Sequence, residues 1–210
     1  PIIRLLAGDT QARVRRLAMN ASNMVAAGLN TALTEPIIAP AGTDAAVFLS
    51  QSPIHADQRS MLAAVRDLMT AAGPALRDPD AGVRVLAQKF FDEAARARLA
   101  WNALPGHSGE DPLREGLKAI LPTLIEAIRD PDPRVRRATI DVLESMGPDA
   151  TPAAVALGEA LGDQDAFVRW AAVRSLSSLG GEATKAALPR LRNLASDPDT
   201  DVREAAEAAV

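Results

Sequence analysis

A short motif occurs five times along this 210-residue chain, and an internal repeat constrains the fold more than any other feature of a sequence. In each copy an Asp is followed by four residues, Val-Arg, two more residues, and then Ala or, once, Thr. We call this Asp the anchor. The copies are Asp9-Val14-Arg15-Ala18, Asp78-Val83-Arg84-Ala87, Asp130-Val135-Arg136-Thr139, Asp163-Val168-Arg169-Ala172 and Asp197-Val202-Arg203-Ala206. Such regularity is typical of a repeat protein.

The distances between anchors vary along the chain. The last three anchors lie 33 and 34 residues apart. The first two lie 69 residues apart, close to two periods, which predicts a degraded repeat near Asp44. The second and third lie 52 residues apart, and we assign the excess to a longer helix over 89–104 and a loop over 105–111.

Each unit reads as two helices joined by a turn. Apolar residues after the anchor follow the spacing of a helix that is buried along one face, as in Val168, Ala172 and Leu176. Gly147 and Gly180 stand at the same distance from their anchors, at the end of the second helix, where a residue that tolerates positive φ is favoured. Another helical segment precedes each of the last three anchors, over 112–128, 151–161 and 182–195. The Asp-Pro-Asp at three anchors ends one helix and caps the next.

The composition agrees with an all-α fold. Apolar residues make up 48% of the chain, aromatic residues only 3%, and Tyr is absent, which argues against a β-sandwich. The absence of Cys excludes disulfides and thiolate sites, and a net charge of −4 gives no global attraction for nucleic acid. The two histidines, His55 and His107, stand alone in Pro- and Gly-containing stretches, so we predict no metal site and no cofactor.

These residues resemble the HEAT-repeat family, in particular its PBS-lyase HEAT-like bacterial variety. The resemblance rests on the anchor motif, on the Leu and Gly that follow it in VRRATIDVLESMG and VRWAAVRSLSSLG, and on Leu-Pro-x-Leu at 121–124 and 188–191. It implies a right-handed α-solenoid of stacked antiparallel helix pairs, with about five to six repeats. We expect a single domain over 1–210, cut from a longer protein, with irregular repeats over 1–56 and regular repeats over 57–210.

The resemblance also implies that the anchors and the motif arginines form a hydrogen-bonded ladder between neighbouring repeats. The ladder residues are Asp78, Arg84, Asp130, Arg136, Asp163, Arg169, Asp197 and Arg203. On this interpretation they are structural. Three positions depart from the family pattern, because Thr139, Gln88 and Glu207 stand where Ala or an apolar residue is expected.

The rare aromatic residues give the best candidates for partner binding. Phe167 and Trp170 lie three residues apart on one helix, and Arg174 follows one turn later. Arg134 and Arg137 occupy the same offsets one repeat earlier. Trp170 can face a partner or pack onto the adjacent repeat, and both readings stay open. A second aromatic group, Phe90, Phe91 and Trp101, is interpreted as core.

We therefore expect a non-catalytic scaffold for protein partners that presents a concave helical surface. No catalytic residue is predicted, because neither the serines nor the paired carboxylates fall in a catalytic motif. The alternatives are an enzyme or enzyme subunit of the HEAT-like type, similar to bilin lyases or DNA-repair glycosylases, and an architectural segment of a larger assembly. Without a signal peptide or membrane span, the sequence favours a cytoplasmic location.

Overall fold

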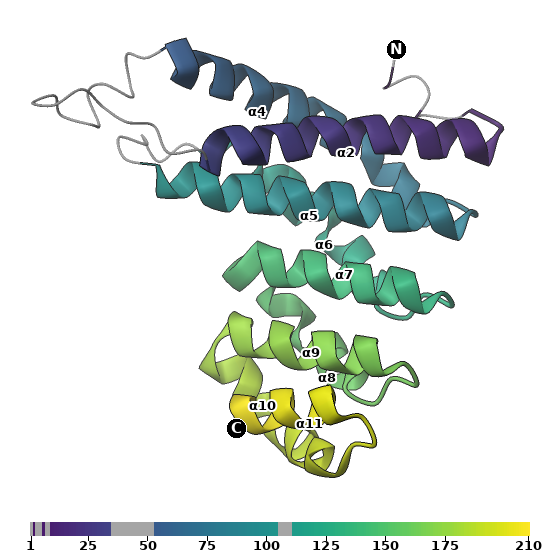
Figure 1. The fold of residues 1–210 in the computed structure, drawn as a ribbon, viewed down its shortest axis with the longest axis vertical. Helices are drawn as coiled ribbons and strands as arrows, with labels where there is room; N and C mark the ends of the chain where they lie inside the picture. The colour runs from purple at the N-terminus through teal and green to yellow at the C-terminus, as the bar shows by residue number, and fades with distance from the viewer. Residues whose placement is uncertain (1, 3–5, 7–8, 35–52, 105–110) are drawn as a thin grey trace, which may run out of the picture. The chain divides into compact units, whose positions relative to one another are not determined.

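The computed structural model describes residues 2, 6, 9–34, 53–104 and 111–210, and these residues form helices and turns without a strand (Figure 1). Their contacts divide the chain into two compact units, Pro1–Ala119 and Ile120–Val210, and each unit is described by itself. The described elements are α2 (Ala12–Thr34), α4 (Pro53–Ala72), η1 (Gly73–Arg77), α5 (Ala81–Ala103), α6 (Arg114–Ala127), α7 (Pro133–Met146), η2 (Gly147–Ala153), α8 (Ala154–Ala160), α9 (Ala166–Leu179), α10 (Gly181–Asn193), η3 (Leu194–Ser196) and α11 (Thr200–Ala209). The all-helical repeat fold is confirmed.

In the first unit, α2 and α5 run parallel and pack along their whole length (Figure 1). The side-chain contacts between them keep a nearly constant offset in sequence of 63 or 64 residues, from Arg15 and Arg16 at one end to Asn30, whose amide donates to Glu93 at 3.1 Å, at the other. Helix α4 packs against α2 and, more narrowly, against α5. The first unit therefore stacks the helix that follows Asp9 directly on the helix that follows Asp78.

This direct packing corrects one expectation. The separation of 69 residues between the first two anchors predicts an intervening repeat near Asp44, but α2 contacts α5 without a helix pair between them. The two motif copies belong to neighbouring repeats, and part of the extra length lies in α2 itself, which has 23 residues against 14 in α7. Asp44 lies outside the described residues.

The long second helix predicted after Asp78 is confirmed. Helix α5 has 23 residues and buries Phe90, Phe91 and Trp101. The rings of Phe90 and Phe91 meet edge to face with their centroids 5.2 Å apart, so this aromatic group is core, as expected. The loop assigned to 105–111 falls almost entirely outside the described residues.

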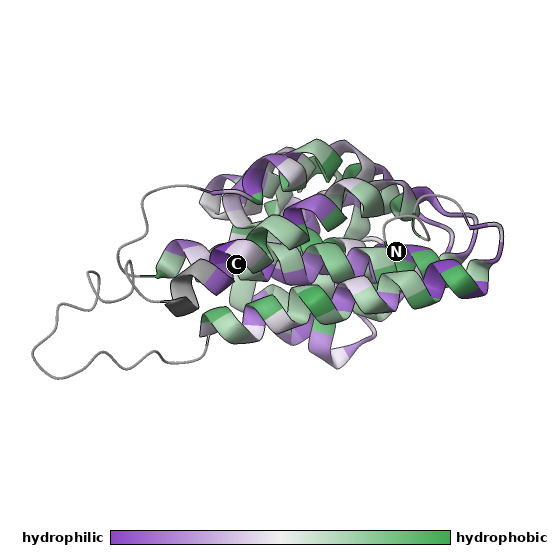
Figure 2. Cartoon of the chain, turned by 90° about the horizontal axis from the view of Figure 1, so that it is seen from above, coloured by the Kyte–Doolittle hydropathy of each residue, from purple (hydrophilic) through white to green (hydrophobic). Residues whose placement is uncertain are grey.

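In the second unit, α7, α9 and α11 lie side by side in one layer, and α8 and α10 pack against α9 from the other layer (Figure 1). The three motif valines, Val135, Val168 and Val202, are fully buried. The helices are striped with hydrophobic and hydrophilic residues, as expected for elements that bury one face against their neighbours (Figure 2). The second unit thus has the layered helix pairs that the repeat predicts.

The turns have the predicted chemistry. Asp80, Asp132, Asp165 and Asp199 are the N-caps of α5, α7, α9 and α11, and the side chain of each accepts a hydrogen bond from a backbone N–H of its own helix. Gly147 and Gly180 follow α7 and α9 with φ of 59° and 100°, a region that residues with a Cβ rarely adopt. Both positions were expected to need glycine.

One first helix is shorter than predicted. Residues 151–161 read as a continuous helix, but the structure has the 3₁₀-helix η2 over Gly147–Ala153 and only seven residues of α-helix in α8. Pro148 stands at the start of η2 and Pro152 lies within it.

The departures from the repeat pattern differ in their surroundings. Thr139 is buried and its hydroxyl donates to the carbonyl of Val135 at 2.8 Å, so it satisfies its own polar group. Glu207 is exposed. Gln88 is fully buried on α5, and neither atom of its amide has a hydrogen-bond partner among the described residues.

We expect Gln88→Leu to stabilise the protein by about 1–2 kcal/mol, because it removes a buried amide whose desolvation is not offset by a hydrogen bond. The measurement is the free energy of unfolding in urea. Lys89→Leu, at the exposed neighbouring position, is the control for helix propensity and should change the free energy by less than about 0.5 kcal/mol. A loss of stability in Gln88→Leu would contradict this account.

Candidate functional site

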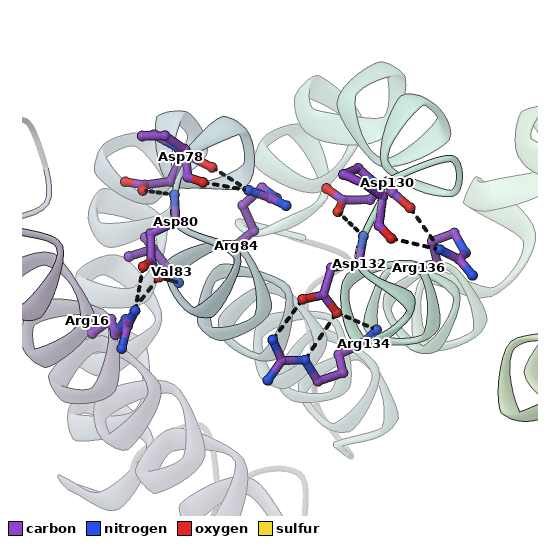
Figure 3. A network of polar contacts seen from close by, with 11 residues as sticks. Arg16, Asp78, Asp80, Val83, Arg84, Asp130, Asp132, Arg134 and Arg136 are labelled. Carbon is purple, nitrogen blue, oxygen red and sulfur yellow. Dashed lines mark hydrogen bonds and ion pairs between the residues drawn. The ribbon is translucent and has the colours of Figure 1, made fainter. Parts of the chain in front are cut away.

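The anchor carboxylates organise the turn before each second helix. Each anchor accepts a hydrogen bond from the backbone N–H two residues later, at 2.8–2.9 Å in all five copies. Because the residue two positions after four of the anchors is the capping Asp, the anchor holds the cap in place. Figure 3 shows this for Asp78 with Asp80 and, in the second unit, for Asp130 with Asp132.

The motif arginines join consecutive repeats within each unit. In the second unit, Arg136 donates through Nε and Nη2 to both oxygens of Asp163, each at 2.7 Å. Arg169 makes the same fork with Asp197, at 2.8 and 2.7 Å. In the first unit, Arg15 makes it with Asp78, at 2.6 and 2.9 Å. Each fork links the arginine of one repeat to the anchor of the next.

The third nitrogen of every motif arginine turns back to its own repeat. Nη1 of Arg15, Arg84, Arg136, Arg169 and Arg203 donates to the carbonyl of the anchor six residues earlier, at 2.6–3.0 Å. In Figure 3 this contact joins Arg84 to the turn at Asp78 and Arg136 to the turn at Asp130. One guanidinium therefore ties two successive turns together, as its planar set of donors allows.

Sequence reasoning left Arg15 out of the ladder. The signal that could have found it was the first motif copy itself, which contains Arg15 at the ladder position. Arg16 adds a second contact, because its guanidinium forms an ion pair with the capping Asp80 (Figure 3). The first unit thus has two adjacent arginines on the turn of the next repeat.

These contacts lower the pKa of the carboxyl groups. The pKa of Asp197 is lowered chiefly by the hydrogen bond from Arg169, while burial acts in the opposite direction. For Asp78, burial alone would raise the pKa, but the bonds from Arg15 and from the backbone N–H of Asp80 outweigh it and the pKa is lowered. The Arg16 guanidinium lowers the pKa of Asp80 to about 2. The folded protein therefore holds these groups as carboxylates.

The candidate partner-binding residues lie on α7 and α9, the second helices of two neighbouring repeats in the second unit. Trp170 lies between two guanidinium groups, with the Cζ of Arg174 4.5 Å and that of Arg137 5.5 Å from the indole centroid. Arg137 also lies 5.9 Å from the centroid of Phe167. We call Arg137, Phe167, Trp170 and Arg174 the ring cluster. The ring of Trp170 is half-buried and packs on Arg137 of the adjacent repeat, which supports the packing reading. That Trp170 also faces a partner stays a prediction.

Carboxylates of α7 lie beside the two arginines of the ring cluster. Glu144 accepts from Arg174 at 2.6 Å, and Asp141 lies 3.6 Å from Nε of Arg137. That Nε is buried and has no hydrogen-bond partner among the described residues, so Arg137 rests mainly on the rings. The sequence shows Asp141 and Glu144 on α7, but the partner of Arg174 depends on how α7 and α9 stack.

The fifth candidate, Arg134, lies apart at the start of α7. Its backbone N–H and its guanidinium both donate to the capping Asp132, at 2.9 and 2.7 Å, as Figure 3 shows. Its side chain is largely exposed. The structure therefore brings four of the five candidates together and places Arg134 in the first turn of α7.

Open grooves run beside the ladder on the turn side of the second unit. One groove, with a volume of about 630 Å³, is lined by Arg169, Arg190, Asp197 and neighbouring residues. Another, of about 460 Å³, is lined by Asp130, Arg136 and Asp163 among others. Within residues 9–34, 53–104 and 111–210, no three His, Asp or Glu residues are grouped so that they could hold a metal ion. No helix in these ranges combines the length and apolar character that crossing a membrane requires.

A family model matches the C-terminal part of the chain. Residues 121–210 match the family model of HEAT repeats, which confirms the resemblance over that segment. No curated protein matches the chain.

Solved structures show the same fold at low sequence identity. A designed armadillo repeat protein in complex with the peptide (KR)4 is 16% identical, with a TM-score of 0.56 over 99% of this chain and 96% of that one. A computationally designed armadillo repeat protein for modular peptide recognition is 17% identical, with a TM-score of 0.54 over 99% and 96%. An engineered protein is 19% identical, with a TM-score of 0.53 over 99% and 93%. These likenesses establish a helical repeat fold.

We expect Arg169→Ala to destabilise the protein by about 2–4 kcal/mol, because it removes the fork and leaves the buried Asp197 carboxylate without its partner. Arg169→Lys should recover only part of this loss, since an ammonium cannot make the fork. Urea denaturation followed by circular dichroism measures both. Arg192→Ala, at an exposed position on α10, is the control, and an effect equal to that of Arg169→Ala would rule out a stabilising ladder.

Asp80→Asn should change how stability depends on pH. Asp80 has a folded pKa of about 2 against an ordinary value of 3.8, so its ion pair stabilises the fold above pH 3.8 and this contribution is lost as pH falls toward 2. The variant retains an oxygen that can cap α5 but loses the charge. We therefore expect it to be less stable than the original chain at pH 6, with a difference that shrinks between pH 4 and about 2. A constant difference in unfolding free energy across this range would contradict the assignment.

Proposed function

We propose that this chain, whose residues 121–210 are HEAT repeats, is a protein-binding module and that the ring cluster is its contact surface. Stacked helix pairs create an extended surface from second helices at a fixed spacing, and such a surface can bind a partner without any catalytic group. Arg134 lies one turn before Arg137 on α7 and extends this surface toward the turns. Partner identity does not follow from the repeats themselves.

The observation that carries the proposal is the exposure of Phe167. Its side chain is 67% exposed, although it follows directly on the N-terminus of α9 and is flanked by the buried Val168. An exposed aromatic ring leaves apolar surface in water, and Trp, Tyr, Phe and Arg are the residues that are enriched where proteins bind one another. The ring cluster combines two such rings with two arginines.

The charges around the ring cluster favour protein over nucleic acid. Each arginine of the cluster has a carboxylate of α7 beside it, Asp141 for Arg137 and Glu144 for Arg174. These carboxylates offset the positive charge that a phosphate backbone would need. The surface is therefore aromatic and of mixed charge.

The ladder residues would serve the site indirectly. Their carboxylates and guanidinium groups are engaged with one another, which supports a structural rather than a ligand-binding role. The fold itself is one on which peptide recognition has been built, since one similar designed protein is solved with the peptide (KR)4 and another was designed for modular peptide recognition. Both facts favour a macromolecular partner over a small substrate.

A photo-crosslinking residue placed at Phe167 tests the proposal in the cell of origin. We expect it to capture a defined protein, and we expect the capture to fall at least about fivefold when Trp170→Ala and Arg137→Ala are added, since removing interface hot spots weakens binding by about that much or more. The same crosslinker at Val155, which is 75% exposed on α8, is the matched control. Equal capture from both positions, or capture that is indifferent to the two substitutions, would refute the surface. Urea midpoints of the variants establish that they remain folded.

A further inference from the structure

One charged group in the groove of about 630 Å³ has no partner in the fold. We call this space the Arg190 groove, after the α10 side chain that lines it, and its other charged residues are Glu159, Asp163, Arg169 and Asp197. Each of these four takes part in an ion pair: the forks hold Asp163, Arg169 and Asp197, and Glu159 pairs with Arg129. Arg190 forms no hydrogen bond or ion pair with any residue in the part of the chain that the structure describes. The unmatched charge of the groove is therefore positive.

Arg190 reaches from its own helix to the first helix of the preceding repeat. Its Nη1 is 3.4 Å from the place that a Cβ on Gly158 would occupy, and Gly158 is buried in α8. The guanidinium thus rests on the backbone of α8 at the wall of the groove, while much of the side chain stays exposed. Its donors are left for a ligand that enters the groove.

The Arg190 groove also has an apolar lining. Leu161 and Leu194 contribute to it and are otherwise buried, and Pro198 lines it from the turn. The volume lies within the range of about 300–1,000 Å³ that is usual for pockets that bind ligands. An apolar side chain from a ligand could therefore pack in the groove while a charged group beside it reaches Arg190.

The corresponding groove one repeat earlier lacks the unmatched cation. That groove, of about 460 Å³, is lined by Ala156, which lies seven residues before its anchor, as Arg190 does. The arginines that line it, Arg129 and Arg136, both pair with carboxylates. The unmatched positive charge is therefore a property of the Arg190 groove and does not follow from the repeat as such.

We propose that the Arg190 groove binds a peptide segment of a partner protein that carries Glu or Asp beside an apolar residue. The carboxylate accepts hydrogen bonds from Arg190, and the apolar side chain packs against Leu161 and Leu194. A negative group is favoured because every carboxylate that lines the groove is already matched by an arginine, so that charge complementarity calls for one more anion. The groove shares no residue with the ring cluster, and the inference thus goes beyond the proposed function.

Short capped peptides of sequence Gly-Leu-X-Leu-Gly test the proposal with the full chain, where X is glutamate, glutamine or lysine. We expect calorimetry to show that the glutamate peptide binds about fivefold more tightly than the glutamine peptide, which has the same shape without the charge. This preference should weaken with added salt. In NMR spectra, the glutamate peptide should shift the backbone amide signals of Gly162 and Leu194, which line the groove, and leave the indole N–H signal of Trp170 in place.

Three outcomes would overturn the proposal. One is equal binding of the glutamate and glutamine peptides, and another is tightest binding of the lysine peptide. The third is tighter binding of an uncapped glutamine peptide than of the capped glutamate peptide, which would assign the groove to a chain terminus instead of an acidic side chain.

Variants of α10 locate the effect. In Arg190→Ala, the preference for glutamate over glutamine should fall to within about twofold, because the group that selects the charge is gone. Arg192→Ala is the matched control, since it removes an exposed arginine of the same helix that does not line the groove, and it should leave the preference unchanged. An unchanged preference in Arg190→Ala would refute the site, and urea midpoints establish that both variants remain folded. If crosslinking at Phe167 fails while the preference depends on Arg190, the proposed function falls and this inference stands.

Discussion

The fork between a motif arginine and the next anchor is the contact on which the rest of this structure depends. Each guanidinium donates to the anchor carboxylate of the following repeat and, through Nη1, to the anchor carbonyl of its own. Two turns are thereby fixed to one planar group, and an error in register would break several charge-assisted bonds at once. Because the anchor carboxylate also binds the backbone N–H beside the cap, the start of the next helix is fixed as well.

The forks also fix the positions of residues in the ring cluster. Arg136 belongs to the ladder and Arg137, the next residue, lies on the rings; Arg169 belongs to the ladder and Trp170 follows it. Because the residue before each of them is fixed by a fork, the backbone at Arg137 and Trp170 has little freedom to move. The rings and the guanidinium groups are therefore held at stacking distance in the absence of a partner. Surfaces that are ordered in advance lose less conformational entropy on binding. The same stacking of neighbouring repeats therefore positions both the ladder residues and the candidate site.

The sequence was sufficient to predict the local structure and the features that recur in each repeat. The helix pairs, the capping aspartates, the glycines with positive φ and the burial of Val135, Val168 and Val202 all follow from spacing and residue type. It was insufficient where the answer depends on which elements meet. The length between Asp9 and Asp78 does not reveal whether it holds another repeat or longer helices, and only the contact of Arg15 with Asp78 decides it. Likewise, the match of Arg174 with Glu144 appears only once α7 and α9 are stacked.

The two tryptophans lie one in each compact unit, and they occupy opposite kinds of surroundings. Trp101 is enclosed in the core of the first unit, whereas Trp170 in the second unit is partly exposed and has two guanidinium groups over its ring. Their fluorescence should consequently differ in wavelength and in accessibility to quenchers. The chain thus contains an intrinsic optical reporter for each unit, so that unfolding of one part can be distinguished from unfolding of the other without any label.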